Sequence, residues 1–241
     1  MSQVILYDLP SKPPCASWSL NPWKPRMILN FKGIDYKTEW VEYPDLVSTL
    51  SSFGLAPNSP NSPGYFTNYS SPAIRFDDGT LMMDSWKIAP ELERRYPTPS
   101  LHLDESIVVQ VRDHVGKLFG PLRPNVLPKI PNLLNNPSAE YFERTREKIF
   151  GMPLSQLEEE KGGEGAWEAI QQPAEEAADL LKKHGGPFFL GKTVSYADLI
   201  FVSFLHCLRR VDEGIFERFI SLDPAFSAIY DASKQWLVKD D

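Results

Sequence analysis

The feature that most constrains the fold is a proline loop followed by two short strands and a helix start. The loop ends in Ser71–Ile74 (SPAI), and Asp84-Ser85 follows twelve residues after Pro72. Proline cannot donate a hydrogen bond to a sheet, so Pro72 predicts an edge, a bulge or a cis peptide bond just before a strand. Asp84-Ser85 predicts the start of a helix, where unpaired backbone N–H groups and the positive end of the helix dipole suit a carboxylate ligand.

The first part of the chain alternates between strand and helix patterns. Strands are predicted over 3–9 and 36–43, lying parallel through a right-handed crossover, with a helix between them that begins near Pro22-Trp23 and ends at Gly33. The other elements predicted here are a helix at 45–53, a loop at 57–71, strands at 73–76 and 80–83, and a helix at 85–96. This order resembles that of a thioredoxin-like domain, which we expect to span residues 1–97.

Beyond the proline-rich linker at 97–100, the sequence indicates helices and no strand. Residues 105–119 carry aliphatic side chains at helical spacing, and the prolines between 121 and 137 are expected to end that helix. Further amphipathic segments are 139–150 and 166–184, the second interrupted by Pro173. We therefore expect an all-helical second domain over residues 105–241.

One helix start in the second half is unusually well specified. Ser195 stands three residues before Asp198, which is the spacing of a capping box, and the apolar run 199–208 that follows is expected to be a buried helix. The preceding segment, 186–193, matches the spacing of glycines, Lys and Thr in a phosphate-binding loop. It contains a proline and three bulky apolar residues, however, and follows a helix rather than a strand, so we predict no nucleotide site there.

Composition and charge exclude several functional classes. The net charge of −7, with no basic half, argues against a nucleic-acid partner. The longest nearly apolar run is about half of the ~20 residues that a membrane span requires, and the N-terminus lacks the pattern of a secretory signal, so we expect no membrane partner and a cytoplasmic location. The scattered histidines and two distant cysteines, Cys15 and Cys207, show neither metal-ligand spacing nor a disulfide framework, so no metal is expected.

The proline loop, the acid-serine helix start and the block 187–198 together resemble the glutathione S-transferase family over the entire chain. The run Trp18–Lys24 (WSLNPWK) is similar to the Trp-Ser-x-Asn-x-Trp-Lys pattern of serine-type fungal members related to bacterial β-etherases, the FuA-like class. The resemblance implies a thioredoxin-like α/β domain followed by an all-helical domain, and a homodimer. It also implies an enzyme that joins glutathione to a hydrophobic, aromatic electrophile, or uses it to cleave an ether or displace another leaving group.

A thiol is a poor nucleophile until it is ionised, and its free pKa is about 8.5, so such an enzyme supplies a hydrogen-bond donor or a helix N-terminus. In serine-type and cysteine-type members this residue lies seven positions before an arginine that Arg26 resembles, which gives Ser19. Asn21 is a second candidate donor. A serine at this place also suits a helix N-cap, and the two roles are compatible. Ser17 is the alternative donor.

The resemblance also implies a set of binding residues. Ser71 would hold the cysteinyl main chain of glutathione, Pro72 would follow a cis bond, and Asp84 and Ser85 would bind the γ-glutamyl end. No Lys or Arg occurs between residues 56 and 69, so Lys24 is the candidate cation for the glycine carboxylate. The electrophile would lie between the two domains, against Trp18, Val115, Phe119, Leu122 and Arg123.

Three alternatives remain open from the sequence. Cys15 as the active residue would make the protein a thiol transferase of the omega kind, although it lies four positions before Ser19. The second alternative is a non-catalytic carrier of hydrophobic ligands that keeps the fold. The third is an enzyme that performs one dedicated glutathione-dependent step in fungal secondary metabolism. Pro90, inside the third predicted helix, removes an N–H group and is expected to kink that helix and disturb the Asp84-Ser85 site.

Overall fold

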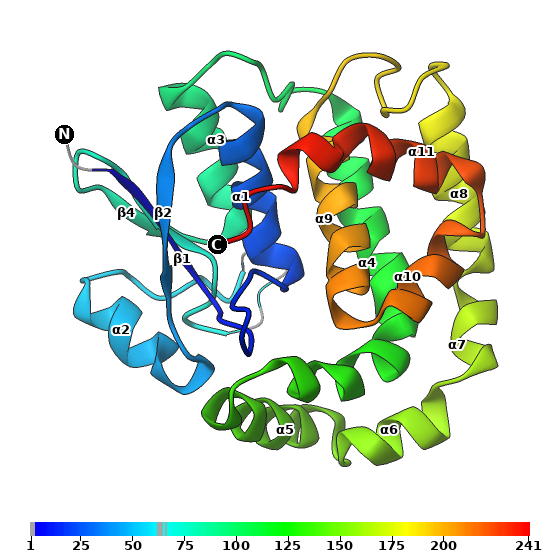
Figure 1. Cartoon of the computed structure of the whole chain (residues 1–241), viewed down its shortest axis with the longest axis horizontal. Helices are drawn as coiled ribbons and strands as arrows, with labels where there is room; N and C mark the ends of the chain where they lie inside the picture. Colours follow the sequence, from blue (N-terminus) through cyan, green and yellow to red (C-terminus); the bar gives the residue numbers. More distant parts are fainter. Residues whose placement is uncertain (1–2, 62–64, 66) are drawn as a thin grey trace.

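The computed structural model describes residues 3–61, 65 and 67–241. Residues 1–2 of the expected first domain, and residues 62–64 and 66 of the expected loop, lie outside the described residues. The described chain forms a four-stranded sheet with helices, followed by a helical half (Figure 1). This arrangement confirms the predicted order of a thioredoxin-like α/β part and an all-helical part.

The sheet has the strand order β2-β1-β3-β4. As predicted, β1 (Val4–Asp8) and β2 (Tyr36–Trp40) are parallel. β3 (Ala73–Arg75) runs antiparallel to β1 and to β4 (Leu81–Met83), and Ala73 is paired with Tyr7 on one side and with Met83 on the other. The end of β1, the start of β3 and the end of β4 therefore share one edge of the sheet.

The helices of the sheet half are α1 (Leu20–Phe31), α2 (Leu46–Ser52) and α3 (Ser85–Arg95), and α1 packs against α3. α1 begins at Leu20 rather than at Pro22-Trp23. Proline is tolerated in the first turn because the N–H groups there have no helical partner. β2 ends at Trp40 rather than at residue 43 because the chain then forms the 3-10 turn η1 (Tyr43–Asp45).

α4 (Ser106–Val126) is the main correction to the predicted elements. It continues through Pro121 and Pro124 and passes into the 3-10 segment η2 (Leu127–Leu133), whereas the prolines predict an end near residue 119. Burying an aliphatic side chain stabilises by about 1.5–3 kcal/mol, so the two that lie beyond residue 119 offset much of the cost of about 3 kcal/mol for each proline. These completely buried side chains are Leu122 and Val126.

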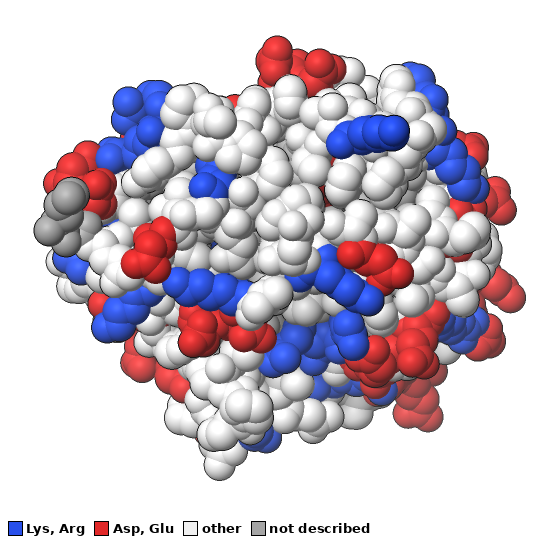
Figure 2. Space-filling view, turned by 45° about the horizontal axis from the view of Figure 1, so that its top comes forward, with Lys and Arg blue, Asp and Glu red and all other residues white. Residues whose placement is uncertain are grey.

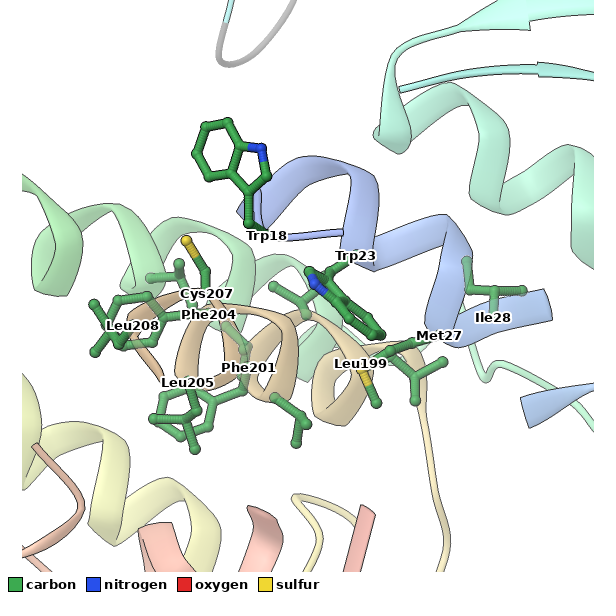
Figure 3. Packing of buried hydrophobic residues seen from close by; sticks show 14 of the residues in the cluster. Trp18, Trp23, Met27, Ile28, Leu199, Phe201, Phe204, Leu205, Cys207 and Leu208 are labelled. Carbon is green, nitrogen blue, oxygen red and sulfur yellow. The ribbon is translucent and has the colours of Figure 1, made fainter. Parts of the chain in front are cut away.

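α9 (Tyr196–Val211) is the central helix of the second half. It packs against α4, α10 and α11, and across the two halves against α1. Figure 3 shows Trp23 and Met27 of α1 directed toward Leu199 of α9. The other elements are α5 (Asn136–Phe150), α6 (Leu154–Lys161), α7 (Glu164–Ala169), α8 (Gln171–Lys182), α10 (Glu213–Ile220), α11 (Pro224–Ser233) and the 3-10 turn η3 (Lys234–Trp236).

Two local predictions in this half have definite outcomes. The capping box of α9 is formed, because the Asp198 carboxylate accepts hydrogen bonds from the Ser195 N–H (2.7 Å) and hydroxyl (2.8 Å), and also from Phe189 N–H (2.8 Å). The predicted segment 166–184 is interrupted at Ile170, between α7 and α8, rather than at Pro173, which lies in the first turn of α8, where its missing N–H is harmless.

The glycines of the segment that matches a phosphate-binding loop are explained by close contact of the main chain. A Cβ at Gly186 would lie 2.2 Å from the carbonyl oxygen of Gly191, so no side chain fits there. Gly191 has a φ of 73°, in the left-handed region that favours glycine, and forms a bridge with Phe188. The spacing therefore serves a tight hairpin in front of α9.

On the face shown in Figure 2, no large area carries charge of a single sign. Basic and acidic side chains are interspersed there among wide uncharged areas. Within the described ranges, none of the helices combines the length and the apolar character that crossing a membrane requires.

Candidate functional site

The three segments singled out in the sequence meet at one edge of the sheet. Ser19 lies at the start of α1, which follows β1; Ser71-Pro72 precedes β3; and Asp84 follows β4. The ends of these strands pair around Ala73, α1 packs against α3, and Lys24 in α1 is close enough to Asp84 to interact with its charge, so the loops and helix starts are neighbours. The topology therefore converts three separate sequence patterns into one site.

The proline loop and the start of α3 are in direct contact. The Ser71–Pro72 bond is cis, as predicted, and the Pro72 carbonyl accepts a hydrogen bond from Asp84 N–H at 3.2 Å. The Ser71 hydroxyl is buried without a hydrogen-bond partner among the described residues. Such an unpaired buried group is uncommon in proteins and is often satisfied by water or a ligand.

Asp84 is the N-cap residue of α3 and has an unusual backbone. Its φ is 80°, a conformation that costs a residue with a side chain on the order of 1–3 kcal/mol, and its carboxylate accepts from Trp86 N–H at 3.0 Å. Ser85 is largely buried, and its carbonyl accepts from the Tyr196 hydroxyl of α9 at 3.3 Å. α3 remains one helix through the exposed Pro90, so the predicted disturbance does not prevent this helix start from forming.

Ser19 occupies the N-cap position of α1, but its side chain makes no capping hydrogen bond. Its carbonyl accepts the first helical bond, from Trp23 N–H at 3.2 Å, and the residue is only partly buried. The Ser19 hydroxyl is therefore available at the positive end of the helix. Asn21 is exposed, and its side-chain oxygen accepts from the Lys24 ammonium at 2.9 Å, which leaves the amide NH₂ free to donate.

The two sequence alternatives to Ser19 lie in less suitable surroundings. The Ser17 hydroxyl has no hydrogen-bond partner among the described residues, but the residue is completely buried, so this donor is shut off from solvent. Cys15 is exposed, but partial burial of its sulfur, reinforced by nearby Asp8 and Glu42, raises the pKa of the thiol. A raised pKa disfavours the thiolate that a thiol-exchange enzyme needs.

Positive charge reaches the site from both halves of the chain. The loss of hydration around Lys24, reinforced by Arg112 and opposed by Asp84, lowers the pKa of this lysine to about 8. Arg112, on α4, places its guanidinium carbon 4.5 Å from the ring centroid of Trp86 at the start of α3. Sequence reasoning missed Arg112 because no local pattern links α4 to α3; only the packing of the halves brings it there.

Only some of the residues expected to line the pocket for the electrophile are exposed. Val115 is almost completely buried and Leu122 completely so, which makes them core residues rather than lining residues. Phe119 is partly buried, edge-on to Phe204 of α9, and the exposed Arg123 lies 5.8 Å above its ring. We therefore keep Phe119 and Arg123 as wall candidates and correct the assignment of the two aliphatic residues.

Trp18 begins the segment that leads into α1 and is 3 % exposed. Its indole ring lies 6.3 Å from that of Tyr43 in η1, and its N–H has no partner among the described residues. Figure 3 shows it above Cys207 of α9. Trp18 is thus a core residue like Val115, and its indole N–H is one unpaired donor beside the candidate site.

Other depressions and donor clusters do not coincide with these residues. A surface depression of about 600 Å³ lies between α4 and α8, lined by residues such as His114, Lys117 and Glu176, and none of the expected wall residues borders it. Across the part of the chain that the structure describes, no group of three or more His, Cys, Asp or Glu side chains is arranged to hold a metal ion.

Comparison with known proteins gives a consistent result. The family models of the glutathione S-transferase N-terminal and C-terminal domains match residues 18–95 and 111–219. The glutathione S-transferase-like protein ustS of Aspergillus flavus is 34% identical over 239 residues, which cover 92% of this chain and 85% of that protein.

Solved structures of fungal proteins agree over the full length of the chain. The glutathione S-transferase CsGST63524 of Ceriporiopsis subvermispora, crystallised with glutathione, has a TM-score of 0.87 and 32% identity over 100% of both chains. Glutathione transferase GSTFuA2 of Phanerochaete chrysosporium has a TM-score of 0.87 and 29% identity over the same share of both chains. The chain therefore belongs to the glutathione S-transferase family and is similar within it to the fungal FuA proteins.

Proposed function

We propose that this transferase uses a serine-stabilised glutathione thiolate to attack an electrophilic carbon of a hydrophobic, aromatic compound. The sulfur–carbon bond forms while an ether oxygen or another leaving group departs with its electron pair, or while a conjugated double bond accepts that pair. The observation that carries the proposal is the uncommitted Ser19 hydroxyl at the helix start beside the proline loop. The glutathione-bound relative CsGST63524 supports glutathione as the co-substrate.

In this proposal, glutathione lies along the shared edge of the sheet. Its cysteinyl main chain pairs with the main chain at Ser71-Pro72, and its γ-glutamyl end meets the free N–H of Ser85 and the Asp84 carboxylate. Lys24 and Arg112 supply the positive charge that the carboxylates of glutathione require, since the 56–69 segment has none. The assignment of Arg112 means that the helical half contributes to glutathione binding.

The catalytic effect in this proposal is electrostatic. Fixed donors that point at a developing or stabilised anion need no reorganisation during the reaction, and losing one of them typically costs a hundredfold or more. The Ser19 hydroxyl and the positive end of α1 lower the pKa of the bound thiol, and the free NH₂ group of Asn21 is the second donor. The thiol proton leaves to solvent before the attack.

Replacing Ser19 by alanine tests this role directly. We expect turnover of 1-chloro-2,4-dinitrobenzene to fall by about a hundredfold, while calorimetric binding of glutathione stays nearly unchanged, because only the thiolate loses its donor. The matched control is Cys15→Ser in the same loop, which should retain turnover. Unchanged turnover in Ser19→Ala would exclude Ser19, and loss of turnover in Cys15→Ser would favour a thiol transferase.

The second candidate function is a ligand carrier with little catalysis. The observation that favours it is the absence of basic residues between 56 and 69, where a glutathione carboxylate would be expected to bind. Quenching of tryptophan fluorescence by hydrophobic ligands with no dependence on glutathione would support this function. A homodimer, a cytoplasmic location, domain limits at 97 and 105, and a dedicated role in fungal secondary metabolism are further parts of the proposal.

A further inference from the structure

The segment of residues 234–241 runs from the helical half back onto the sheet half and ends beside the loop that carries Ser19 (Figure 1). We propose that this segment positions Ser19, so that stabilisation of the thiolate depends on its docking. The inference rests on the proposed function of Ser19. It assigns a catalytic consequence to residues that lie outside both matched domains.

The first part of the segment is held by the C-terminal end of α1. The side-chain amide of Asn30 donates to the carbonyls of Trp236 (2.7 Å) and Lys239 (3.1 Å). The Trp236 ring meets Phe31 edge-on, with ring centroids 5.2 Å apart. These contacts fix the direction in which the segment crosses toward β2.

The last two residues reach the N-terminal end of α1. Ser17 N–H donates to the carbonyl of Asp240 at 2.8 Å, and the hydroxyl of Thr38 on β2 donates to the main-chain oxygen of Asp241 at 2.6 Å. Arg26 donates to the same oxygen at 3.0 Å. The segment therefore contacts the loop before α1, the helix itself and the neighbouring strand.

Arg26 links this docking to the sheet. Its guanidinium is completely buried and forms an ion pair at 2.9 Å with the equally buried Asp8 at the end of β1. A buried guanidinium needs its hydrogen bonds made within the protein, because water does not replace them. Arg26 Nε already has no partner among the described residues, and removing the Asp241 oxygen leaves Nη1 with a single weaker contact, to the Tyr36 hydroxyl at 3.3 Å.

The peptide of Ser17 is clamped from both sides. The segment holds its N–H, and the Trp23 indole donates to its carbonyl at 3.2 Å. Trp23 in turn packs edge-on against His206 of α9, with centroids 4.4 Å apart. Ser19 is only two residues away, so loss of one side of the clamp allows its hydroxyl to shift, and a shift of about 1 Å can cost on the order of a hundredfold in rate.

The segment adds only two partly buried apolar side chains, Trp236 and Leu237, to the periphery of the hydrophobic core. None of its side chains is fully buried, and its bonds to the sheet half are made mainly by main-chain carbonyls. Removing it should therefore loosen the Ser17 peptide more than it destabilises the fold. This is the property that separates a positioning role from a merely structural one.

The experiment compares the full chain with a chain that stops after Ser233. We expect the pKa of the bound glutathione thiol, read from thiolate ultraviolet absorbance, to rise toward the free value in the shortened chain. We expect kcat to fall about tenfold or more while KM for glutathione changes by less than about twofold. A synthetic peptide of residues 234–241 should restore both quantities. A folded shortened chain with unchanged thiol pKa and kcat would overturn the proposal.

Thr38→Val and Thr38→Ser form a matched pair that leaves the segment in place. The valine removes both the donor to Asp241 and the oxygen that accepts from Arg26 at 3.1 Å, and should lower kcat a few-fold, whereas the serine keeps both contacts and should behave as the parent. Hydrogen exchange at Ser17 N–H reports docking without any turnover. If the full chain protects this amide and the shortened chain does not, but no thiolate forms in either, the proposed function fails while docking stands. Equal exchange in both chains contradicts the docking itself.

Discussion

Lys24 is the residue near the site whose charge changes closest to neutral pH. Its pKa of about 8 means that the ammonium is present below this pH and is lost above it. We therefore expect the affinity for S-methylglutathione, which has no titrating thiol, to decrease as the pH rises through about 8. Calorimetric titrations between about pH 6.5 and 9 measure this, and Lys24→Arg should remove the dependence, because arginine stays charged throughout. If the affinity of Lys24→Arg for S-methylglutathione decreases in the same way as the pH rises, the pH dependence belongs to another group.

The candidate site residues that the sequence could name are those next to a local structural signal. Ser19, Pro72 and Asp84 each mark a helix start or a strand entry, and such positions have strong residue preferences. Arg112 carries no such signal, because its approach to Trp86 depends on how two helices far apart in sequence pack. Leu122 was expected in the wall because the family resemblance implies that this helix lines the pocket, but it is completely buried.

At the scale of elements, the buried cap of α9 joins the Phe188–Gly191 hairpin to the helix. Burial raises the pKa of Asp198 to about 6 from 3.8, despite the hydrogen bonds that it accepts. The folded protein therefore binds this proton more tightly than the unfolded chain does. Between about pH 4 and 6 the folded state carries more protons, so the contribution of Asp198 to stability falls as the pH rises, by up to about 3 kcal/mol.

Asp198→Asn should remove this slope from the free energy of unfolding. It should also destabilise the protein by about 1–3 kcal/mol near neutral pH, because the amide NH₂ cannot accept from Ser195 N–H. Chemical unfolding at several pH values measures both effects. Asp223→Asn at the cap of α11 is the control, since there burial is outweighed by Lys182, which lowers the pKa and gives a slope of opposite sign. If the free energy of unfolding depends on pH in the same way in the parent and in Asp198→Asn, Asp198 is not the group responsible for the slope.

Prolines were the least reliable guide to the limits of elements. Pro22 and Pro173 lie in first turns, where they are harmless, but Pro90, Pro121 and Pro124 lie inside helices that continue through them. A proline removes one hydrogen bond, and its cost is local, whereas the buried face of a helix gains stability along its whole length. A prediction from sequence takes the local cost of a proline into account but underestimates the stability that the buried face of the helix provides.

At the scale of the whole molecule, the order of the two halves was predictable and their mutual contacts were not. The strand pattern ends before the linker at 97–100, and only helical spacing follows it, which is enough to give the architecture. The return of residues 234–241 onto α1 and β2 has no sequence signature, because it uses main-chain carbonyls that every residue possesses. Long-range contacts of this kind follow from the three-dimensional fold alone.

The flank of α4 that bears Phe119 and Arg123 also bears Gly116 and Gly120, where an added Cβ would meet no heavy atom within 4 Å. Glycine inside a helix costs about 1 kcal/mol relative to alanine, so Gly116→Ala should raise the free energy of unfolding by about that amount. The same methyl group would narrow the space beside Phe119. We expect bulky electrophiles to lose turnover while small ones keep it, in a comparison of kcat/KM for substrates of increasing width. Equal losses of kcat/KM for narrow and wide substrates would contradict the expectation that Gly116→Ala narrows the space beside Phe119. In the proposed site, Gly116 and Gly120 thus exchange helix stability for clearance beside Phe119, and substitutions there would set how wide a substrate the site accepts.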